Sequence, residues 1–349
     1  MASVVSHAPE RLARPHAMNA SRAAAIWIAL GVATFVVLVA SLMTGSVTLP
    51  VSRALGALFH ANAATPDIAD EIVLTLRLPR ALAGFATGAL LAMAGALLQV
   101  LLRNPLAEPY VLGVSGGAAT FALAAMLASV PWWGVDIAAC AGAFASIVVV
   151  LGLARKDLWQ SGQDASPRLL LTGVVIASGW GALITLILSI APENRLRGMI
   201  FWLTGDLNGA AAPWPALIAL AVALVAIVPV APQLNVLLRG DATARALGVP
   251  VERLRLRVYL VASIAAAAAV TTAGTIGFVG LVVPHLLRLA FGNDQRMLVP
   301  AAALAGGLAV MAADLAARTV IAPAQLPVGV VTALIGVPMF LWMLLRRPR

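Results

Sequence analysis

Few side chains in this 349-residue sequence have types and spacing suited to catalysis. The four histidines are far apart in the chain: His7, His16, His60 and His285. There is no His-Glu-x-x-His string and no nucleophile beside a base, which argues against a membrane hydrolase. Asp314 precedes Arg318 by four residues, so we expect a salt bridge on one helix face rather than a proton relay. We predict no catalytic residue and no metal site, and we expect His285 to make a packing contact.

The chain also lacks the residues that hold a nucleotide. No Gly-x-x-x-x-Gly-Lys-Ser/Thr loop is present, and the single lysine, Lys156, lies in Leu-Ala-Arg-Lys-Asp. We therefore predict a non-enzyme without a cofactor of its own, so any ATP and Mg would be bound by a partner. Ion-coupled carriers bury ionisable groups near the bilayer midplane, whereas the acids here fall almost entirely in loops. A secondary carrier is the less favoured alternative.

The elements that must position these residues are apolar helices. The sequence is 62% hydrophobic and 11% charged, against roughly 25% charged in an ordinary soluble domain. Several apolar runs reach the ~20 residues that a helix needs to cross a bilayer. We predict an all-α polytopic membrane protein, a compact bundle of ten spans at about 23–43, 81–102, 111–130, 135–154, 169–191, 214–231, 258–273, 276–291, 298–317 and 328–345.

The basic residues predict the orientation of this bundle. With both termini in the cytoplasm, 17 of the 23 lysines and arginines lie on the cytoplasmic side and six lie outside, as the positive-inside rule requires. The formal charge of +9 is thus scattered between spans, and we predict no nucleic-acid partner. Residues 1–22 are expected to form a cytoplasmic arm, and residues 23–349 a single domain. The only cysteine, Cys140, is expected to be a small buried side chain.

Several separated strings then occur in a characteristic order. Leu-Arg-Leu-Pro-Arg ends at Arg80, and Asn-Pro-Leu-Ala-Glu-Pro begins at Asn104. Phe-Trp-Leu-Thr-Gly follows at 201–205, Gly-Phe-Val-Gly-Leu-Val-Val-Pro-His at 277–285, and Leu-Pro-Val-Gly-Val-Val-Thr at 326–332. From about residue 70 to the C-terminus this series resembles the permeases of type II ABC importers, the FecCD family, which handle ferric siderophores, haem and cobalamin.

The resemblance implies partners and residues that contact them. A second copy of the chain, two cytoplasmic ATPase subunits, a periplasmic binding protein and membrane lipid are implied, in a bacterial inner membrane. Arg77, Arg80 and Arg318 correspond to family arginines that receive acidic side chains of the binding protein. Exposed guanidinium groups suit that role because they steer an acidic partner and bind carboxylates bidentately. Ordinary anchoring of helix ends is the alternative.

The resemblance also implies gate and coupling residues. Asn104 and Leu106 correspond to the family's cytoplasmic gate, although the two prolines around them also suit a structural turn. Ser166 occupies a second gate position, where Pro167 departs from the pattern of the cobalamin importer. A segment at about 239–257 resembles the coupling helices that sit in a groove of the ATPase, and its residue types suit a short helix from about 240 to 248 with Gly240 and Asp241 as a plausible cap. Its expected coupling residues are Gly240, Asp241, Ala246, Leu247 and Gly248.

The expected cargo follows from the scarcity of polar groups in the predicted bundle. A pathway without strong ligands suits a bulky chelate and ill suits a bare metal ion. Within the family we favour ferric siderophore or haem moving from periplasm to cytoplasm, with cobalamin as the alternative.

Overall fold

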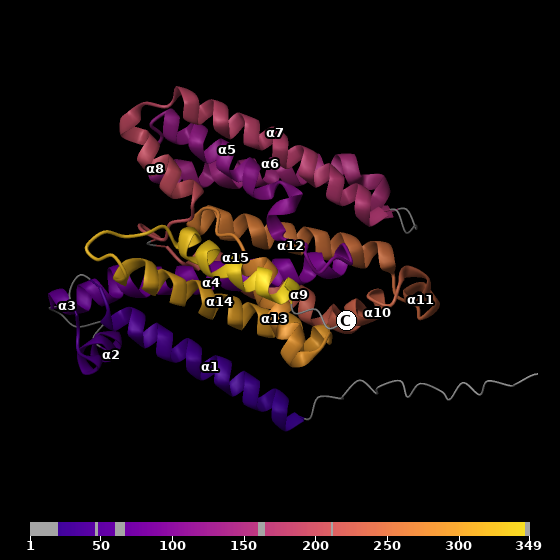
Figure 1. Cartoon of the computed structure of the whole chain (residues 1–349), viewed down its shortest axis with the longest axis horizontal. Coiled ribbons are helices and arrows are strands. Elements are labelled where there is room, and N and C mark those ends of the chain that lie inside the picture. The colour runs from indigo at the N-terminus through magenta and orange to yellow at the C-terminus, as the bar shows by residue number, and fades with distance from the viewer. Residues whose placement is uncertain (1–19, 46–47, 60–66, 160–164, 211, 346–349) are drawn as a thin grey trace, which may run out of the picture.

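The computed structural model describes residues 20–45, 48–59, 67–159, 165–210 and 212–345, and the regular elements in these ranges are all helices (Figure 1). Their bounds are α1 Ala20–Met43, α2 Val51–Phe59, α3 Ile68–Glu71, η1 Ile72–Arg77, α4 Leu78–Leu101, η2 Pro109–Leu112, α5 Val114–Leu127, α6 Trp132–Trp159, α7 Ala165–Ile190, α8 Glu193–Leu203, α9 Trp214–Ile227, η3 Val228–Val230, α10 Ala231–Leu237, α11 Asp241–Ala246, α12 Val251–Ala273, α13 Val279–Phe291, α14 Gln295–Thr319 and α15 Val328–Leu345. The all-helical fold class is confirmed.

Helix α4 is the central element of the fold. It packs against α14, α12, α13 and α9, and nearly all of its residues from Ala81 to Leu101 are buried. Helices α5, α6 and α7 form a second group, which lies above the α4 group in Figure 1, with α12 between them. Helix α1 flanks the opposite side of α4. Because α4 is buried on all sides, its two ends are held firmly relative to the rest of the bundle.

Small residues make this close packing possible. A Cβ atom added to Gly88 of α4 would overlap the carbonyl oxygen of Gly306 in α14, and one added to Gly95 would overlap that of Gly280 in α13. Backbones approach this closely only where side chains are absent. The stripe of small residues that contains Gly84, Gly88 and Ala92 is therefore a packing surface.

The helix around the first arginines begins earlier than the sequence predicts. Residues 68–101 form one continuous helical stretch, whose π-helical segment η1 ends at Arg77, just before Pro79. Proline lacks an N–H group and its ring clashes with the carbonyl four residues earlier, and a wider π-turn accommodates this defect without breaking the helix. Arg77 and Arg80 thus lie within the helix rather than before it.

A short non-helical segment separates α12 from α13. The chain leaves the helix at Gly274, with φ +66°, and re-enters it after Phe278, whose φ of +69° is left-handed. The sequence correctly indicates a junction at residues 273–275, but α13 begins at Val279 rather than at 276. A non-glycine residue in this conformation persists only where its surroundings hold it there.

The number of spans is only partly defined by helix length. Seven described helical segments are long and apolar enough to cross a membrane. Three shorter apolar helices, at Val114–Leu127, Val279–Leu289 and Val328–Met343, coincide with three further predicted spans. The protein is therefore a multi-pass helical membrane protein, while the count of ten stays a prediction.

The outermost helices carry apolar surface outward. In an 18-residue apolar stretch of α1 no residue is buried within the chain, and in the corresponding stretch of α7 only 6% of the residues are buried. Cys140 is exposed on α6, so the expectation that it is buried is wrong. In a membrane protein an apolar side chain can face lipid or a neighbouring subunit, and apolar sequence therefore does not by itself predict burial.

Candidate functional site

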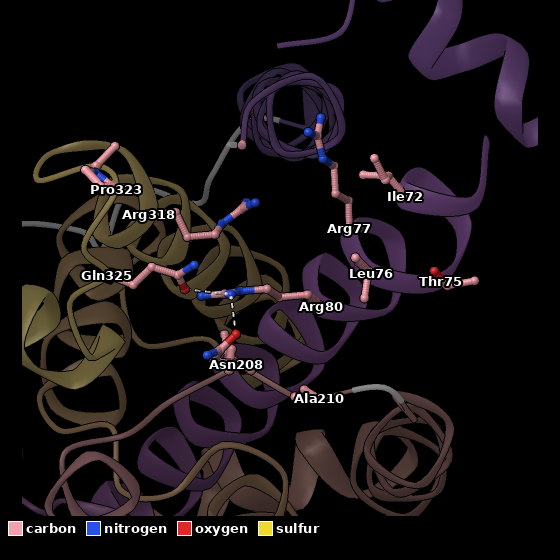
Figure 2. A pocket seen from close by; sticks show the side chains of 14 residues that line it. Ile72, Thr75, Leu76, Arg77, Arg80, Asn208, Ala210, Arg318, Pro323 and Gln325 are labelled. Atoms are coloured by element: carbon pink, nitrogen blue, oxygen red, sulfur yellow. Dashed lines mark hydrogen bonds between the residues drawn. The ribbon is translucent and has the colours of Figure 1, made fainter. Parts of the chain in front are cut away.

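A pocket of about 500 Å³ lies where α4 begins and α14 ends (Figure 2). It is lined by Gly45, Ile72, Thr75, Leu76, Arg77, Arg80, Leu207, Asn208, Gly209, Ala210, Arg318, Ala322, Pro323 and Gln325. Its lining thus includes the three arginines that the sequence analysis singles out, although they are far apart in the chain. We call it the outer pocket, after the side on which the predicted orientation places it.

Asp314 holds two of these arginines. The Nε and Nη2 groups of Arg80 donate to Oδ1 of Asp314 over 3.0 and 2.8 Å, and Nε of Arg318 lies 3.0 Å from Oδ2. The predicted pair of Asp314 and Arg318 is therefore present. The participation of Arg80 was not predictable, because it comes from a residue more than 230 positions away.

Polar side chains at the rim complete the contacts of Arg80. Its Nη1 group donates to Oε1 of Gln325 over 3.1 Å and lies 3.4 Å from Oδ1 of Asn208 (Figure 2). One carboxylate, that of Asp314, and two amide side chains thus fix the guanidinium plane across the pocket.

Arg77 binds the end of α1 instead. Its Nη1 group donates to the carbonyl oxygens of Leu42 and Met43 over 2.6 and 2.9 Å. These carbonyls lie at the C-terminus of α1, where the helix dipole favours a positive charge. Arg318 also reaches this region, with Nη1 3.3 Å from the carbonyl oxygen of Thr44. The arginines therefore connect α4, α14 and the end of α1.

The expectation that these guanidinium groups are exposed is wrong. Arg77 is 6% exposed, and the side chains of Arg80 and Arg318 are 11% and 8% exposed. Backbone carbonyls of Leu42 and Met43 accept from Arg77, and Asp314 pairs with Arg80 and Arg318, and such partners are what allow arginines to be buried. Their role in docking stays a prediction, and it requires an incoming carboxylate to reach into the pocket.

The electrostatic balance of the outer pocket is positive. Three arginines line the pocket beside one paired acid, Asp314, and a further acid, Asp206, lies nearby. Burial raises the pKa of Asp206, against the opposing effects of a hydrogen bond from the backbone N–H of Asn208 and the charge of Arg80. A site with excess positive charge attracts acidic groups.

At the other end of α4 the predicted coupling segment forms a short helix. Helix α11 lies between Gly240, with φ +113°, and Gly248, with φ +76°. The N–H of Gly248 donates to the carbonyl of Arg245, and that of Val249 to the carbonyl of Ala244, which closes the helix end as a Schellman motif. The predicted helix from about 240 to 248 is confirmed.

Asp241 does not cap this helix as the sequence suggests. Its side chain makes no capping hydrogen bond; one carboxylate oxygen contacts Arg103, and the other accepts a 2.7 Å hydrogen bond from Arg255. Helix α11 is thereby attached to the end of α4 and to α12. Ala246 and Gly248 are exposed, and Leu247 exposes 63% of its surface.

The predicted gate residues follow α4 directly. Oδ1 of Asn104 accepts a 2.9 Å hydrogen bond from the N–H of Leu106, which forms a tight turn and leaves Leu106 43% exposed. Ser166 lies in the first turn of α7, and its side chain falls outside the described residues. The structure therefore does not bring Ser166 into a described contact with Asn104.

Several residues of these two ends were missed by sequence reasoning. Asn208, Gln325, Asp206, Arg103 and Arg255 all contact or face the predicted residues. Only Arg103 carried a signal, as a cation next to Asn104. Among the described residues no group of three His, Cys, Asp or Glu side chains could hold a metal ion, and the prediction of no metal site stays a prediction.

These features define a class. Helices of membrane-spanning length define a multi-pass helical membrane protein, with a basic pocket at one end of its central helix and an anchored helix with an exposed leucine at the other. The family comparison makes this specific: residues 33–346 match the FecCD transport family, and the chain belongs to it.

Similar proteins agree with this assignment. The chain is 43% identical over 284 residues to the cobalamin import system permease protein BtuC of Halobacterium salinarum, covering 80% of this chain and 74% of that protein. It is 40% identical over 286 residues to the vitamin B12 import system permease protein BtuC of Salmonella typhi, covering 80% and 85%. A solved structure of a metal-chelate type ABC transporter in an inward-facing conformation matches with a TM-score of 0.80 at 27% identity, over 93% of this chain and all of that one.

Proposed function

We propose that this chain carries cobalamin from the periplasm to the cytoplasm. As a FecCD-family member it is the permease subunit of a type II ABC importer for metal chelates. The observation that carries the choice of cobalamin is the 40–43% identity to permeases that are named for cobalamin or vitamin B12 import. Ferric siderophore or haem, which the sequence analysis favours, is the alternative cargo.

The proposed topology has ten spans, with both termini in the cytoplasm of a bacterium and the bundle in its inner membrane. Helix α5 has 14 residues and is about 21 Å long, less than the ~30 Å of the hydrocarbon layer, so η2 and the turn after α5 must extend it. The start of α1 and the end of α15 lie toward the same end of the bundle as α11 (Figure 1). The excess of basic residues in the predicted cytoplasmic segments supports this orientation.

The proposed domain organisation is one permease domain, residues 23–349, preceded by a cytoplasmic arm, residues 1–22. The burial of α4 by helices from both halves of the chain supports a single unit. The exposed apolar faces of α7 and α15 leave room for membrane lipid and for a second copy of the chain.

The energy for transport is proposed to come from partners. Two ATPase subunits would bind ATP and Mg, and α11 would insert Leu247 into a groove of each, with Gly240, Asp241, Ala246 and Gly248 shaping the segment. A leucine that is 63% exposed on an anchored helix is a surface that gains from burial. This chain would then contribute no catalytic step.

The periplasmic binding protein is proposed to dock at the outer pocket. Its acidic side chains would reach Arg77, Arg80 and Arg318, whose combined charge exceeds that of Asp314. At the cytoplasmic end, Asn104, Leu106 and Ser166 are proposed to form the gate that the released cargo passes.

Uptake by reconstituted vesicles tests the proposal. The permease would be incorporated with its ATPase and binding protein, and labelled cobalamin, ferric siderophore and haem would be offered in parallel. We expect ATP-dependent uptake of cobalamin. Uptake of an iron chelate but not cobalamin would contradict the proposed cargo while leaving the importer class intact.

A further inference from the structure

Arg103 joins the two functional segments at the cytoplasmic end of α4. It is the last residue before the turn at Asn104, and its backbone is left-handed, with φ +47°. Its Nη2 group contacts Oδ1 of Asp241 at the start of α11 and lies 3.5 Å from the carbonyl oxygen of Leu237. A non-glycine residue in this conformation costs free energy that the surrounding contacts must offset.

Asp241 is shared by two arginines. Its second oxygen accepts the 2.7 Å hydrogen bond from Arg255 of α12, so one carboxylate bridges the end of α4 and α12 through α11. The side chains of Arg255, Asp241 and Arg103 are 5%, 13% and 32% exposed. Ion pairs in such partly dry surroundings are screened less by salt than surface pairs, and they hold a fixed geometry.

The loop that follows Arg103 also contacts the non-helical segment between α12 and α13. Oε1 of Glu108 accepts a 2.9 Å hydrogen bond from the N–H of Phe278, the residue with left-handed backbone. The hydroxyl of Tyr110 donates to the carbonyl of Ile276 over 3.1 Å and accepts from its N–H over 2.9 Å. The loop 103–110 thus has one firm attachment to α11 and another inside the bundle.

We infer that the Arg103–Asp241 ion pair is the positioning contact that transmits displacement of α11 to the loop carrying Asn104 and Leu106. The pair makes α11 and the start of this loop move as one body, while Arg255 guides the motion along α12. The inference rests on the proposed function, in which α11 contacts the ATPase and the loop forms the gate. Arg103 has no role in that proposal until this contact is considered.

The test measures labelled cobalamin transported per ATP hydrolysed, in vesicles that contain the permease, its ATPase and the binding protein. Arg103→Gln should lower this ratio about 2-fold to 30-fold, the range found for residues that modulate coupling, while the ATPase remains bound. Arg103→Lys keeps the charge and should recover most of the ratio. The matched control is Arg296→Gln, which removes the more exposed 2.7 Å pair with Asp294 at the start of α14, outside α11 and the loop, and should leave the ratio unchanged.

A double-mutant cycle separates this role from a general structural one. If the pair acts as one contact, Arg103→Gln should add nothing to the effect of Asp241→Asn, whereas additive effects would overturn the inference. An unchanged ratio in Arg103→Gln would overturn it as well. If Arg103→Gln does not assemble, Asp241→Glu, which displaces the carboxylate, is measured instead. A lowered ratio in Asp241→Glu supports the inference, and an unchanged ratio refutes it.

Leu247→Asp distinguishes failure of the inference from failure of the proposed function. If Leu247→Asp abolishes transport and Arg103→Gln leaves the ratio unchanged, only the inference fails. If Leu247→Asp transports normally, α11 is not the ATPase contact, and the proposed coupling fails together with the inference.

Discussion

Replacing Leu247 by aspartate should separate folding of the permease from its coupling to the ATPase. Leu247 exposes 63% of its surface at the end of α11 and has little packing to lose. Substitutions at such positions change the free energy of unfolding by about 0.5 kcal/mol or less. The isolated variant should therefore have the same melting temperature as the wild type.

The effect on the complex should be larger. Burying a whole leucine contributes about 1.5–3 kcal/mol, and the part of Leu247 still exposed accounts for about 1–2 kcal/mol of that. Losing it weakens ATPase binding about fivefold to thirtyfold, since 1.4 kcal/mol is a factor of ten. A carboxylate desolvated in the ATPase groove weakens it further.

The assay is binding of the purified ATPase to the permease in detergent, followed by transport in vesicles. Val320→Asp is the matched control, because Val320 is 73% exposed beyond the outer end of α14 and should not affect ATPase binding. Wild-type ATPase affinity and transport in Leu247→Asp would refute the assignment of α11 as the coupling helix.

Four further predictions concern docking and stability. Arg77→Glu with Arg80→Glu should weaken docking of the binding protein, more strongly at low salt, and unchanged docking in a surface-binding assay would contradict the role of the outer pocket. Asp314→Asn leaves Arg80 and Arg318 without their shared carboxylate and should lower the free energy of unfolding by about 3–5 kcal/mol; a melting curve like that of the wild type would count against this. Gly88→Val should abolish the folded protein in membrane extracts because its Cβ meets the backbone of Gly306, whereas Gly152→Ala, with open space around it, should be tolerated. Hydrogen bonds from Arg296 and from the Asn235 amide lower the pKa of Asp294 to about 2, although partial burial opposes them. The ionised Asp294 side chain therefore stabilises the fold fully above about pH 4, and this contribution is lost as the pH falls toward 2. Asp294→Asn should flatten this part of the curve of melting temperature against pH.

The helical membrane fold was predictable because apolar runs of spanning length admit few alternatives. Packing was partly predictable: the stripe that includes Gly88 indicated a close helix contact, and Gly306 supplies the partner. The start of the helix near Pro79 was not predictable, because the π-helical turn before this proline keeps the helix continuous. The predicted burial of Cys140 was wrong, because an apolar segment in a membrane can face lipid.

The candidate sites were predictable as types and positions but not as contacts. The four-residue spacing revealed the pair of Asp314 and Arg318, whereas the addition of Arg80 depends on how α4 packs on α14. Asp241 looked like a helix cap, yet it pairs with Arg103 and Arg255, which a single helix pattern cannot show. Long-range ion pairs of this kind follow from the fold and not from local sequence.

The energy source of transport tests the central claim most directly. Vesicles containing the permease, its ATPase and the binding protein would be loaded with ATP or left without it, with and without a proton gradient, and uptake of labelled cobalamin would be followed. An ABC importer predicts uptake that requires ATP hydrolysis and persists when the gradient is collapsed. Uptake that continues without ATP and stops when the gradient collapses would contradict the claim.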